Sequence, residues 1–319
     1  MTIAVGQIQA LTTKAIMAKG GVADLVFKNN AYLERLRAKQ GVYSGESLTF
    51  PVNIFNSDQT NGSFYVGGAT LNTNEYDPYT QLRFQLKEIQ ETLFLTNRDI
   101  ALNSGKQAIL KLVEQRLKSM KQAMSERMTK GIFSDGTAAT GAATVDQFIG
   151  MQAFLLNTGV NYGELLSSDV AAHIAYVSSN SGTARALTTA LDQSVLGGAS
   201  EGNNKPTLRI MRQNVMDQFV ELLKPYQRTT REDNLDGLGH GKNTLVYSGV
   251  DSIVDNLAVA QSIAYLNEEF VKLYAHPDFD MVTMEKDGLE TKDGVLNRLF
   301  FKGVYACNVL RYQGFLKDI

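Results

Sequence analysis

A single apolar stripe along residues 104–130 constrains the fold of this chain more than any other feature. Apolar side chains recur there at helical spacings, at Ile109, Val113, Leu117, Met120, Met124 and Met128. Such spacing places them on one face of a helix, which Asn103 or Ser104 can cap and after which Gly131 favours a stop. At ~1.5 Å per residue this helix spans about 40 Å. A helix of this length with one apolar face is typical of a strut that lies against a sheet.

Two stretches before this helix indicate extended chain. Apolar and polar residues alternate over 47–54, which predicts a half-buried strand. Pro51 cannot donate a ladder hydrogen bond, so this strand should lie at a sheet edge. A turn-rich tip follows, and a second extended run at 64–66 completes a long hairpin that must lie on another element, because isolated hairpins are marginal in water. Alternation also predicts a strand over 80–96, although residues 87–93 alternatively fit a helix.

The first 40 residues are basic and have few apolar positions. Six cations stand against two anions, a net charge of +4: Lys14, Lys19, Lys28, Arg35, Arg37 and Lys39 against Asp24 and Glu34. We predict an arm with a short helix near 29–38 and no core of its own. The alternative is a partly frayed terminus.

A Gly/Ala/Thr-rich linker at 133–144 is the best candidate for a boundary. Residues 145–265, which follow it, have the pattern of a mixed α/β unit. The expected helices lie at 145–156, 168–178, 184–195 and 213–223, and the expected strands at 205–211 and 244–254. From residue 266 onward the chain is mainly extended.

Composition excludes several classes of protein. Lys+Arg 31 against Asp+Glu 33 gives a formal net charge of -2, which argues against a polybasic nucleic-acid coat. One cysteine, Cys307, excludes an intrachain disulfide framework and a multi-thiolate metal site. The histidines, His173, His240 and His276, are too far apart in sequence to form a local ligand pair. No apolar run approaches the ~18 residues of a membrane helix, and the first residues lack the basic region of a signal peptide. We therefore expect a protein of the reducing cytoplasm.

No motif has the specificity of a catalytic centre. Residues 237–243, GLGHGKN, lack the final Ser/Thr and the preceding buried strand of a phosphate loop. The sequence contains no GxSxG elbow and no HExxH pair. Residues 276–280, HPDFD, are interpreted as a turn capped by Asp278, and Cys307 as a buried, inert thiol.

Two carboxylates four residues apart, Asp251 and Asp255, are interpreted as rim and turn residues and not as an acid/base pair. With this last candidate set aside, we predict no catalytic, cofactor-binding or metal-binding residue in the chain.

Three stretches, together with the order of the elements, resemble a known family. Residues 133–155 resemble an F-x-DG turn followed by an FxGLxxxL-like helix, 205–228 a strand-then-helix segment, and 244–256 a strand pair whose turn has Asp251 in place of proline. The order is a basic arm, a hairpin, a strand, a long helix, a Gly-rich joint, an α/β unit and returning strands. This resembles the major capsid protein of tailed double-stranded-DNA bacteriophages, with its Hong Kong 97-like fold, over essentially the whole chain.

The resemblance implies an α+β, Hong Kong 97-like capsid fold divided into named parts. Residues 1–40 would be the N-terminal arm and 41–78 the extended E-loop hairpin. Residues 79–135 with 266–319 would form the peripheral domain, whose spine helix would span about 104–130. Residues 136–265 would form the α/β axial domain, which meets its copies around the capsomer axis.

The resemblance also implies a structural protein and not an enzyme. Copies of the chain would assemble in the host cytoplasm into hexamers and pentamers, and these would form the icosahedral head shell of the virion around double-stranded DNA. A coreless edge hairpin and a basic arm suit this role, because contacts between chains can complete them. The alternatives are an encapsulin-like nanocompartment shell of the same fold and, from another class, an α/β enzyme with an unrecognised site.

The implied partners follow from two departures from the family pattern. Only about 40 residues precede the E-loop, so we expect no fused scaffold but a separate scaffolding protein, with a portal and a decoration or cement protein. Residues 41–78 contain no lysine, so a covalent cross-link from that loop is not expected. Contact with packaged DNA should be non-specific. No cofactor and no membrane contact are expected.

The loop and the long helix carry opposite charge. Residues 41–78 have a net charge of −4, whereas 104–130 have seven cations and two anions, a net charge of +5. In the family geometry the loop of one subunit lies over the peripheral domain of its neighbour. We therefore hypothesise an electrostatic contact between subunits, whose candidate residues are Glu46, Asp58, Glu75, Asp77, Lys111, Lys118 and Lys121.

Overall fold

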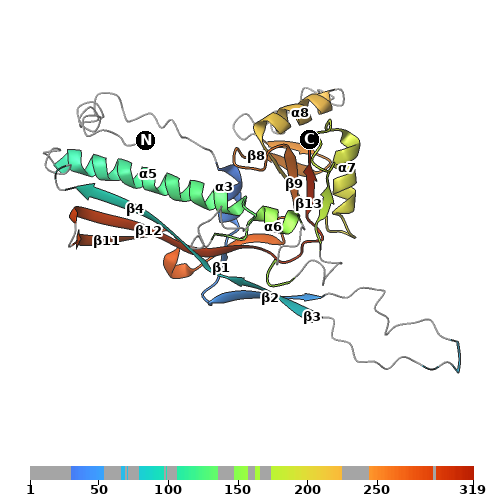
Figure 1. Ribbon diagram of the computed structural model, residues 1–319, viewed down its shortest axis with the longest axis horizontal. Coiled ribbons are helices and arrows are strands. Elements are labelled where there is room, and N and C mark those ends of the chain that lie inside the picture. The colour runs from blue at the N-terminus through green and yellow to red at the C-terminus, as the bar shows by residue number, and fades with distance from the viewer. Residues whose placement is uncertain are drawn as a thin grey trace, which may run out of the picture.

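Two β-sheets, one long helix and a projecting ribbon make up the molecule (Figure 1). The computed structural model describes residues 30–53, 66–68, 70, 79–96, 98, 106–135, 147–156, 162–165, 174–224, 244–289 and 292–319. One continuous hydrophobic core joins the first sheet to one face of the second, and a smaller core lies on the second sheet's other face.

The first sheet is built around one long C-terminal strand. Its strands are β1 Gly41–Val42, β4 Lys87–Thr96, β10 Val271–Ala275, β11 Val282–Leu289 and β12 Lys292–Cys307. One edge of β12 pairs antiparallel with β4, while its other edge pairs first with β11 and then with β10. Strand β1 adds to β10 in parallel. Residues 87–93 are therefore strand, and the helical alternative for them is wrong.

Helix α5, Lys106–Ile132, covers one face of this sheet (Figure 1). The predicted stripe is confirmed where side chains are described, because Met120, Met124 and Met128 are all buried. The expected stop at Gly131 is wrong, since the helix runs one residue further. A Cβ on Gly131 would lie 3.0 Å from the Phe148 ring, so here glycine provides room for close packing and does not end the helix.

The second sheet carries the α/β unit. Its order is β5-β13-β9-β6-β8-β7, formed by β5 Tyr176–Ser178, β6 Leu208–Met211, β7 Thr244–Tyr247, β8 Val250–Val254, β9 Ser262–Leu266 and β13 Gly314–Lys317. Helices α7 Thr189–Gly198 and α8 Gln213–Leu223 pack on one face and form the smaller core. The sequence resemblance groups residues 266–319 with 79–135, which include strand β4 of the first sheet. Strand β13, within 266–319, lies in the second sheet instead.

Several predictions for this unit are confirmed, and others need correction. Helix 213–223 and the strand within 205–211 are present. The stretch 244–254 is a hairpin, whose turn places Ser248 and Gly249 at φ of 54° and 70°, the left-handed region that favours glycine. The expected helix at 168–178 is wrong in its last three residues, which form β5.

The remaining helices are shorter or shifted. The expected helix at 145–156 shrinks to α6, Met151–Leu155. The expected helix at 184–195 begins at Thr189, because the Thr188 hydroxyl accepts the Leu191 amide and caps it there. Most of the linker at 133–144 and all of the motif at 237–243 lie outside the described residues.

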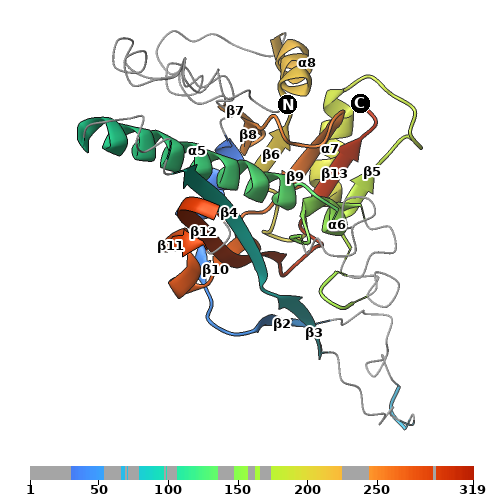
Figure 2. The ribbon, with the colours of Figure 1, turned by 60° about the vertical axis from the view of Figure 1, so that its left-hand side comes forward.

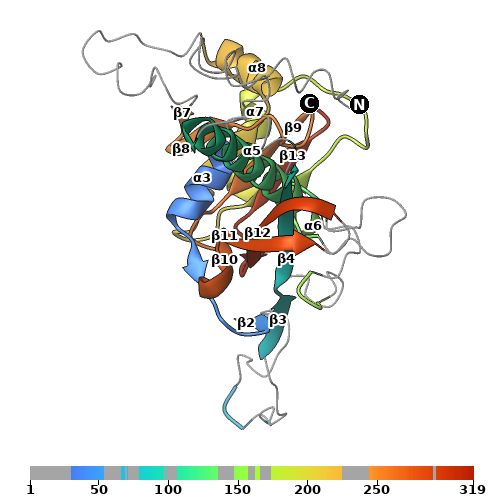
Figure 3. The same ribbon diagram turned by 90° about the vertical axis from the view of Figure 1, so that its left-hand side faces the viewer.

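A separate two-stranded ribbon projects from the body (Figures 1 and 3). Strand β2, Ser47–Asn53, confirms the predicted edge strand and pairs antiparallel with β3, Tyr79–Gln85. Strand β3 is the first half of the long expected strand 80–96, which breaks at Leu86. Of the expected partner at 64–66, residues 64 and 65 lie outside the described residues. One face of the described part of the ribbon is buried against the body along its length, through Leu48, Val52, Leu82 and Phe84.

Candidate functional site

Potential catalytic groups in the described part of the chain serve structural roles. No group of three or more His, Cys, Asp or Glu side chains there could hold a metal ion. Burial raises the pKa of the Cys307 thiol, consistent with an inert core cysteine. The turn at 276–280 is capped by His276, whose Nδ1 accepts the Asp278 amide, so the expectation that Asp278 is the cap is wrong. None of the helices among these residues could span a bilayer.

The two carboxylates, Asp251 and Asp255, differ in how deeply they are buried. Asp251 lies at the surface and pairs with Arg35. Asp255 is only 1% exposed, and this burial raises its pKa. Its interpretation as a turn residue is confirmed, because its backbone carbonyl accepts the Ala258 amide at 3.1 Å. Its Oδ1 accepts the backbone amide of Leu257 at 3.0 Å. Asp255 therefore holds the turn that follows β8, the strand that contacts helix α3, Ala31–Ala38.

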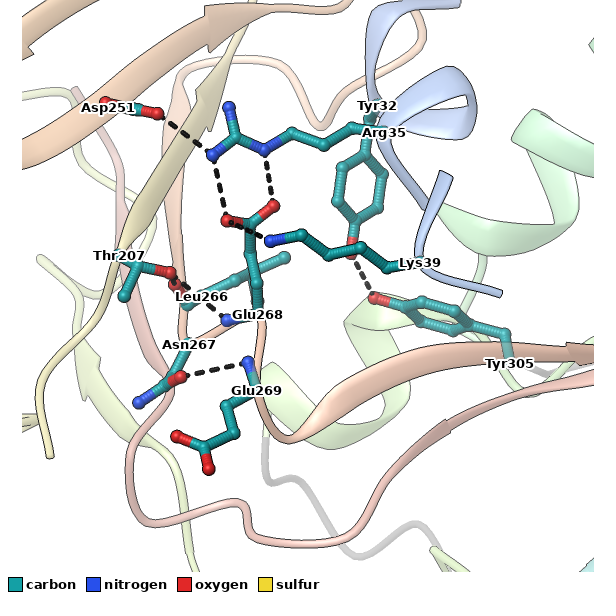
Figure 4. A network of polar contacts seen from close by, with 10 residues as sticks. All are labelled: Tyr32, Arg35, Lys39, Thr207, Asp251, Leu266, Asn267, Glu268, Glu269 and Tyr305. Carbon is teal, nitrogen blue, oxygen red and sulfur yellow. Dashed lines mark hydrogen bonds and ion pairs between the residues drawn. The ribbon is translucent and has the colours of Figure 1, made fainter. Parts of the chain in front are cut away.

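Helix α3 is docked on both sheets and is not frayed (Figure 4). Its Tyr32 hydroxyl shares a hydrogen bond of 2.9 Å with the hydroxyl of Tyr305 on β12. Arg35 forms a two-pronged ion pair with Glu268 in the β9–β10 connection, and its Nη2 lies 2.9 Å from Asp251 Oδ2 on β8. The predicted helix near 29–38 is confirmed, but its buried side chains belong to the main core. Sequence reasoning missed this docking, for which the only signal was the Tyr-Leu-x-x-Leu spacing.

A fully buried ion pair holds the second sheet to helix α7. Arg209 on β6 and Asp192 on α7 are both 0% exposed, and two bonds of 2.9 Å join them. Tyr265 donates its hydroxyl proton to Asp192 at 2.7 Å, while Arg209 also donates to the carbonyls of Tyr247 and Val250. The side-chain nitrogens of Arg209 and the carboxylate oxygens of Asp192 all form hydrogen bonds inside the protein, which indicates a structural role.

The projecting ribbon belongs to neither of the two large sheets. Strands β2 and β3 pair only with each other among the described strands. One backbone bond, from the Arg83 amide to the Gly163 carbonyl at 2.9 Å, also ties β3 to the body. The exposed side chain of Tyr79 lies at the outer end of the ribbon. Unpaired strand edges are templates for contact with another chain.

Helix α5 presents cations on its outer surface. Arg127 pairs with Glu91 on β4 at 2.6 Å, and Lys130 pairs with Glu126 at 2.9 Å, so these two charges are compensated within the chain. The remaining exposed lysines, Lys118 and Lys121, form no ion pair with any other described residue.

The predicted contact residues divide into three groups. Glu46, Lys118 and Lys121 are exposed, as a contact between chains requires, and no described ion pair joins Glu46 to either lysine. Lys111 lies in α5, but its side chain is outside what the structure describes. Asp58, Glu75 and Asp77 lie outside the described residues altogether.

Comparisons with known proteins give one family match. The family model described as SU10 major capsid protein matches residues 13–297. A search of curated proteins finds no match to this sequence.

Solved structures match the chain along nearly its whole length. The cyanophage A-1(L) capsid asymmetric unit matches with a TM-score of 0.72 at 14% identity, covering 93% of this chain and 95% of that one. The SrpI encapsulin complex from Synechococcus elongatus PCC 7942 gives a TM-score of 0.56 at 12% identity, over 100% and 96%. The phage G structure of gp27 major capsid and gp26 decoration proteins gives 0.54 at 10% identity, over 100% of both chains. These structures share the fold of this chain.

Proposed function

The chain belongs to the SU10 major capsid protein family, and from this premise we propose how its elements build a shell. It is a structural protein of the icosahedral head shell of a tailed phage, located in the virion, and not an enzyme. Its α+β, Hong Kong 97-like fold, predicted from the order of elements, is confirmed. The proposal concerns the finer roles of the parts, the capsomers that they form and their partners.

In this proposal helix α5 is the spine helix and the β2–β3 ribbon, with the residues between its strands, is the E-loop. Of the other residues, 1–40 act as the N-terminal arm, 86–135 and 266–313 as the peripheral domain, and 136–265 together with β13 as the axial domain. The observation that supports the assignment is the ribbon, which projects from the body and whose strands pair only with each other among the described strands. An element of this kind is completed by a neighbouring subunit.

The shell is proposed to consist of hexamers and pentamers of this chain around double-stranded DNA. A separate scaffolding protein and a portal would direct its assembly. The phage G structure contains decoration proteins, which supports a decoration or cement protein as a partner here. With a net charge of -2 overall, contact with DNA should be weak, sequence-independent and sensitive to salt.

Expression of the chain, alone and with its neighbouring genes, tests this function. We expect capsomers or closed particles by size-exclusion chromatography and electron microscopy. Particles filled with DNA in the presence of the packaging genes support the phage shell, whereas particles that enclose a protein cargo support a nanocompartment of the same fold. A small oligomer of fixed size under every condition would contradict the shell.

The charges of the loop and of α5 are proposed to meet between subunits. Lys118 and Lys121 are exposed and unpaired among the described residues, and Glu46 is exposed at the start of β2. Exposed pairs contribute only about 0–1 kcal/mol each. They recur at every equivalent contact of a closed shell, however, and complementary charge helps to set the register of association.

Reversal of Glu46 and Asp58 to lysine should lower the salt and temperature limits of the particles without changing the folding of the subunit. Like charges would then face Lys118 and Lys121. Particle melting at low ionic strength, where screening is weak, measures the effect.

Two further variants sharpen this test. The compensating changes Lys118→Glu and Lys121→Glu should partly restore the particles, whereas Glu221→Lys, on exposed helix α8, should behave like the parent. If the loop reversals assemble and melt like the parent at low salt, these charges are only solvated.

A further inference from the structure

Two of the segments that connect the two sheets lie against each other. Residues 267–270 lead from β9 to β10, and 308–313 lead from β12 to β13. The Asn267 amide donates to Gln313 Oε1 at 2.8 Å, and the Asn308 amide donates to the Phe270 carbonyl at 3.1 Å. Segments 267–270 and 308–313 therefore cross between the sheets side by side, and together they are called the joint.

Helix α3 adds attachments to both sheets and to this joint (Figures 2 and 4). Tyr32 binds β12 through Tyr305, and β1, shortly after the helix, extends the first sheet beside β10. Arg35 binds β8 in the second sheet through Asp251 and the joint itself through Glu268. A single turn of helix therefore contacts the first sheet, the second sheet and the connection between them.

Arg35 is suited to this position by its shape as well as its charge. Its planar guanidinium engages both oxygens of Glu268 and one oxygen of Asp251 at the same time. A lysine ammonium could replace the charge but not this fork. Glu268 is only 14% exposed, and Lys39 Nζ lies 3.4 Å from its Oε2, the oxygen that also accepts from Arg35 Nη2. Hydrogen bonds to Glu268 raise the pKa of Arg35, so the cation is retained at every physiological pH.

We propose that α3 is a brace that fixes the angle between the two sheets, that Arg35 is its positioning residue, and that this angle sets the curvature of the shell. The second part rests on the proposed function, since only an assembled shell has a curvature. Every subunit repeats the same angle, so a small change in it accumulates over a closed surface and changes the diameter at which the surface closes.

Two variants of Arg35 test the brace in the full-length protein. In Arg35→Ala, amide hydrogen exchange over 31–38 and 271–275 should become roughly tenfold faster or more, as expected when charge-assisted bonds to a docked element are lost. Particles of this variant should differ from the parent in diameter or be heterogeneous in size by electron microscopy. Arg35→Lys, which keeps the charge, should fold like the parent and show an intermediate effect on both readouts.

Arg127→Ala is the matched control. It removes an exposed arginine ion pair that joins α5 to β4 within the first sheet's own layers and does not reach the second sheet. Exchange and diameter should both stay as in the parent.

The outcomes separate the brace from the function. If exchange over α3 in both Arg35 variants equals that of the parent, the brace is wrong. If exchange accelerates but particles keep the parental diameter and uniformity, the link to curvature is wrong. If the parent itself forms no shells, the proposed function fails and the curvature link with it, while hydrogen exchange still decides whether the brace exists.

Discussion

Replacement of Asp192 with alanine should destabilise the subunit by about 3–5 kcal/mol, because it leaves the buried charge of Arg209 without its partner. Both side chains are 0% exposed, so water cannot take the place of the carboxylate. The hydroxyl of Tyr265 would lose its acceptor as well. Urea unfolding of the unassembled subunit measures the loss as a fall in the midpoint at unchanged slope.

Removal of both charges provides the control for this prediction. The double variant Asp192→Ala with Arg209→Met should be more stable than Asp192→Ala alone, although it carries two changes. The reason is that an apolar replacement of a buried pair avoids the cost of an isolated buried ion. Equal stability of the single variant and the parent would show that the cavity admits water or a counter-ion.

Deletion of Asn56–Ser63 should abolish closed shells while the subunit still folds. This segment, NSDQTNGS, has no apolar side chain to contribute to a core, and it lies outside the described residues. The base of the ribbon keeps its buried contacts, including the Phe84 and Tyr162 rings at 5.0 Å. Electron microscopy reports the shells, and thermal melting of the unassembled subunit reports the fold.

Replacement of Asn56–Ser63 with a Gly/Ser segment of equal length tests whether the loop acts through its length or through its side chains. If the loop acts through its side chains, this variant should assemble as poorly as the deletion; if through its span alone, it should assemble like the parent. Normal closed shells from the deletion variant would refute the assignment of the ribbon as the E-loop.

Elements governed by local periodicity could be predicted from the sequence. Helix α8 and strand β2 follow their apolar patterns closely, and α5 departs from its predicted span by only two residues at each end. Pairing between distant strands could not be predicted in this way. The partner of β2 was sought at 64–66, because a hairpin usually pairs nearby residues, whereas the chain uses 79–85. Alternation identifies a strand but does not identify its neighbour.

For the candidate site, too, contacts between distant elements could not be predicted from local patterns. Glu46, Lys118 and Lys121, which were proposed from the opposite charges of the loop and the long helix, are exposed. The roles of Arg35 and Arg209 did not, because an arginine in the sequence gives no sign that carboxylates from distant elements surround it. Contacts between subunits are a further step away, since no periodicity within one chain specifies the surface of its neighbour.

The pairing of β4 with β12 also determines when this protein can fold during synthesis. Residue 87 pairs with residue 303 and residue 96 with residue 294, so the sheet beneath α5 forms only after almost the whole chain has left the ribosome. Until then the methionine face of α5 has no sheet to cover it and is a site for aggregation. Such non-local pairing slows folding. The nascent chain is therefore exposed to aggregation until β12 has been made, and a subunit with a complete first sheet is available for assembly only after that point.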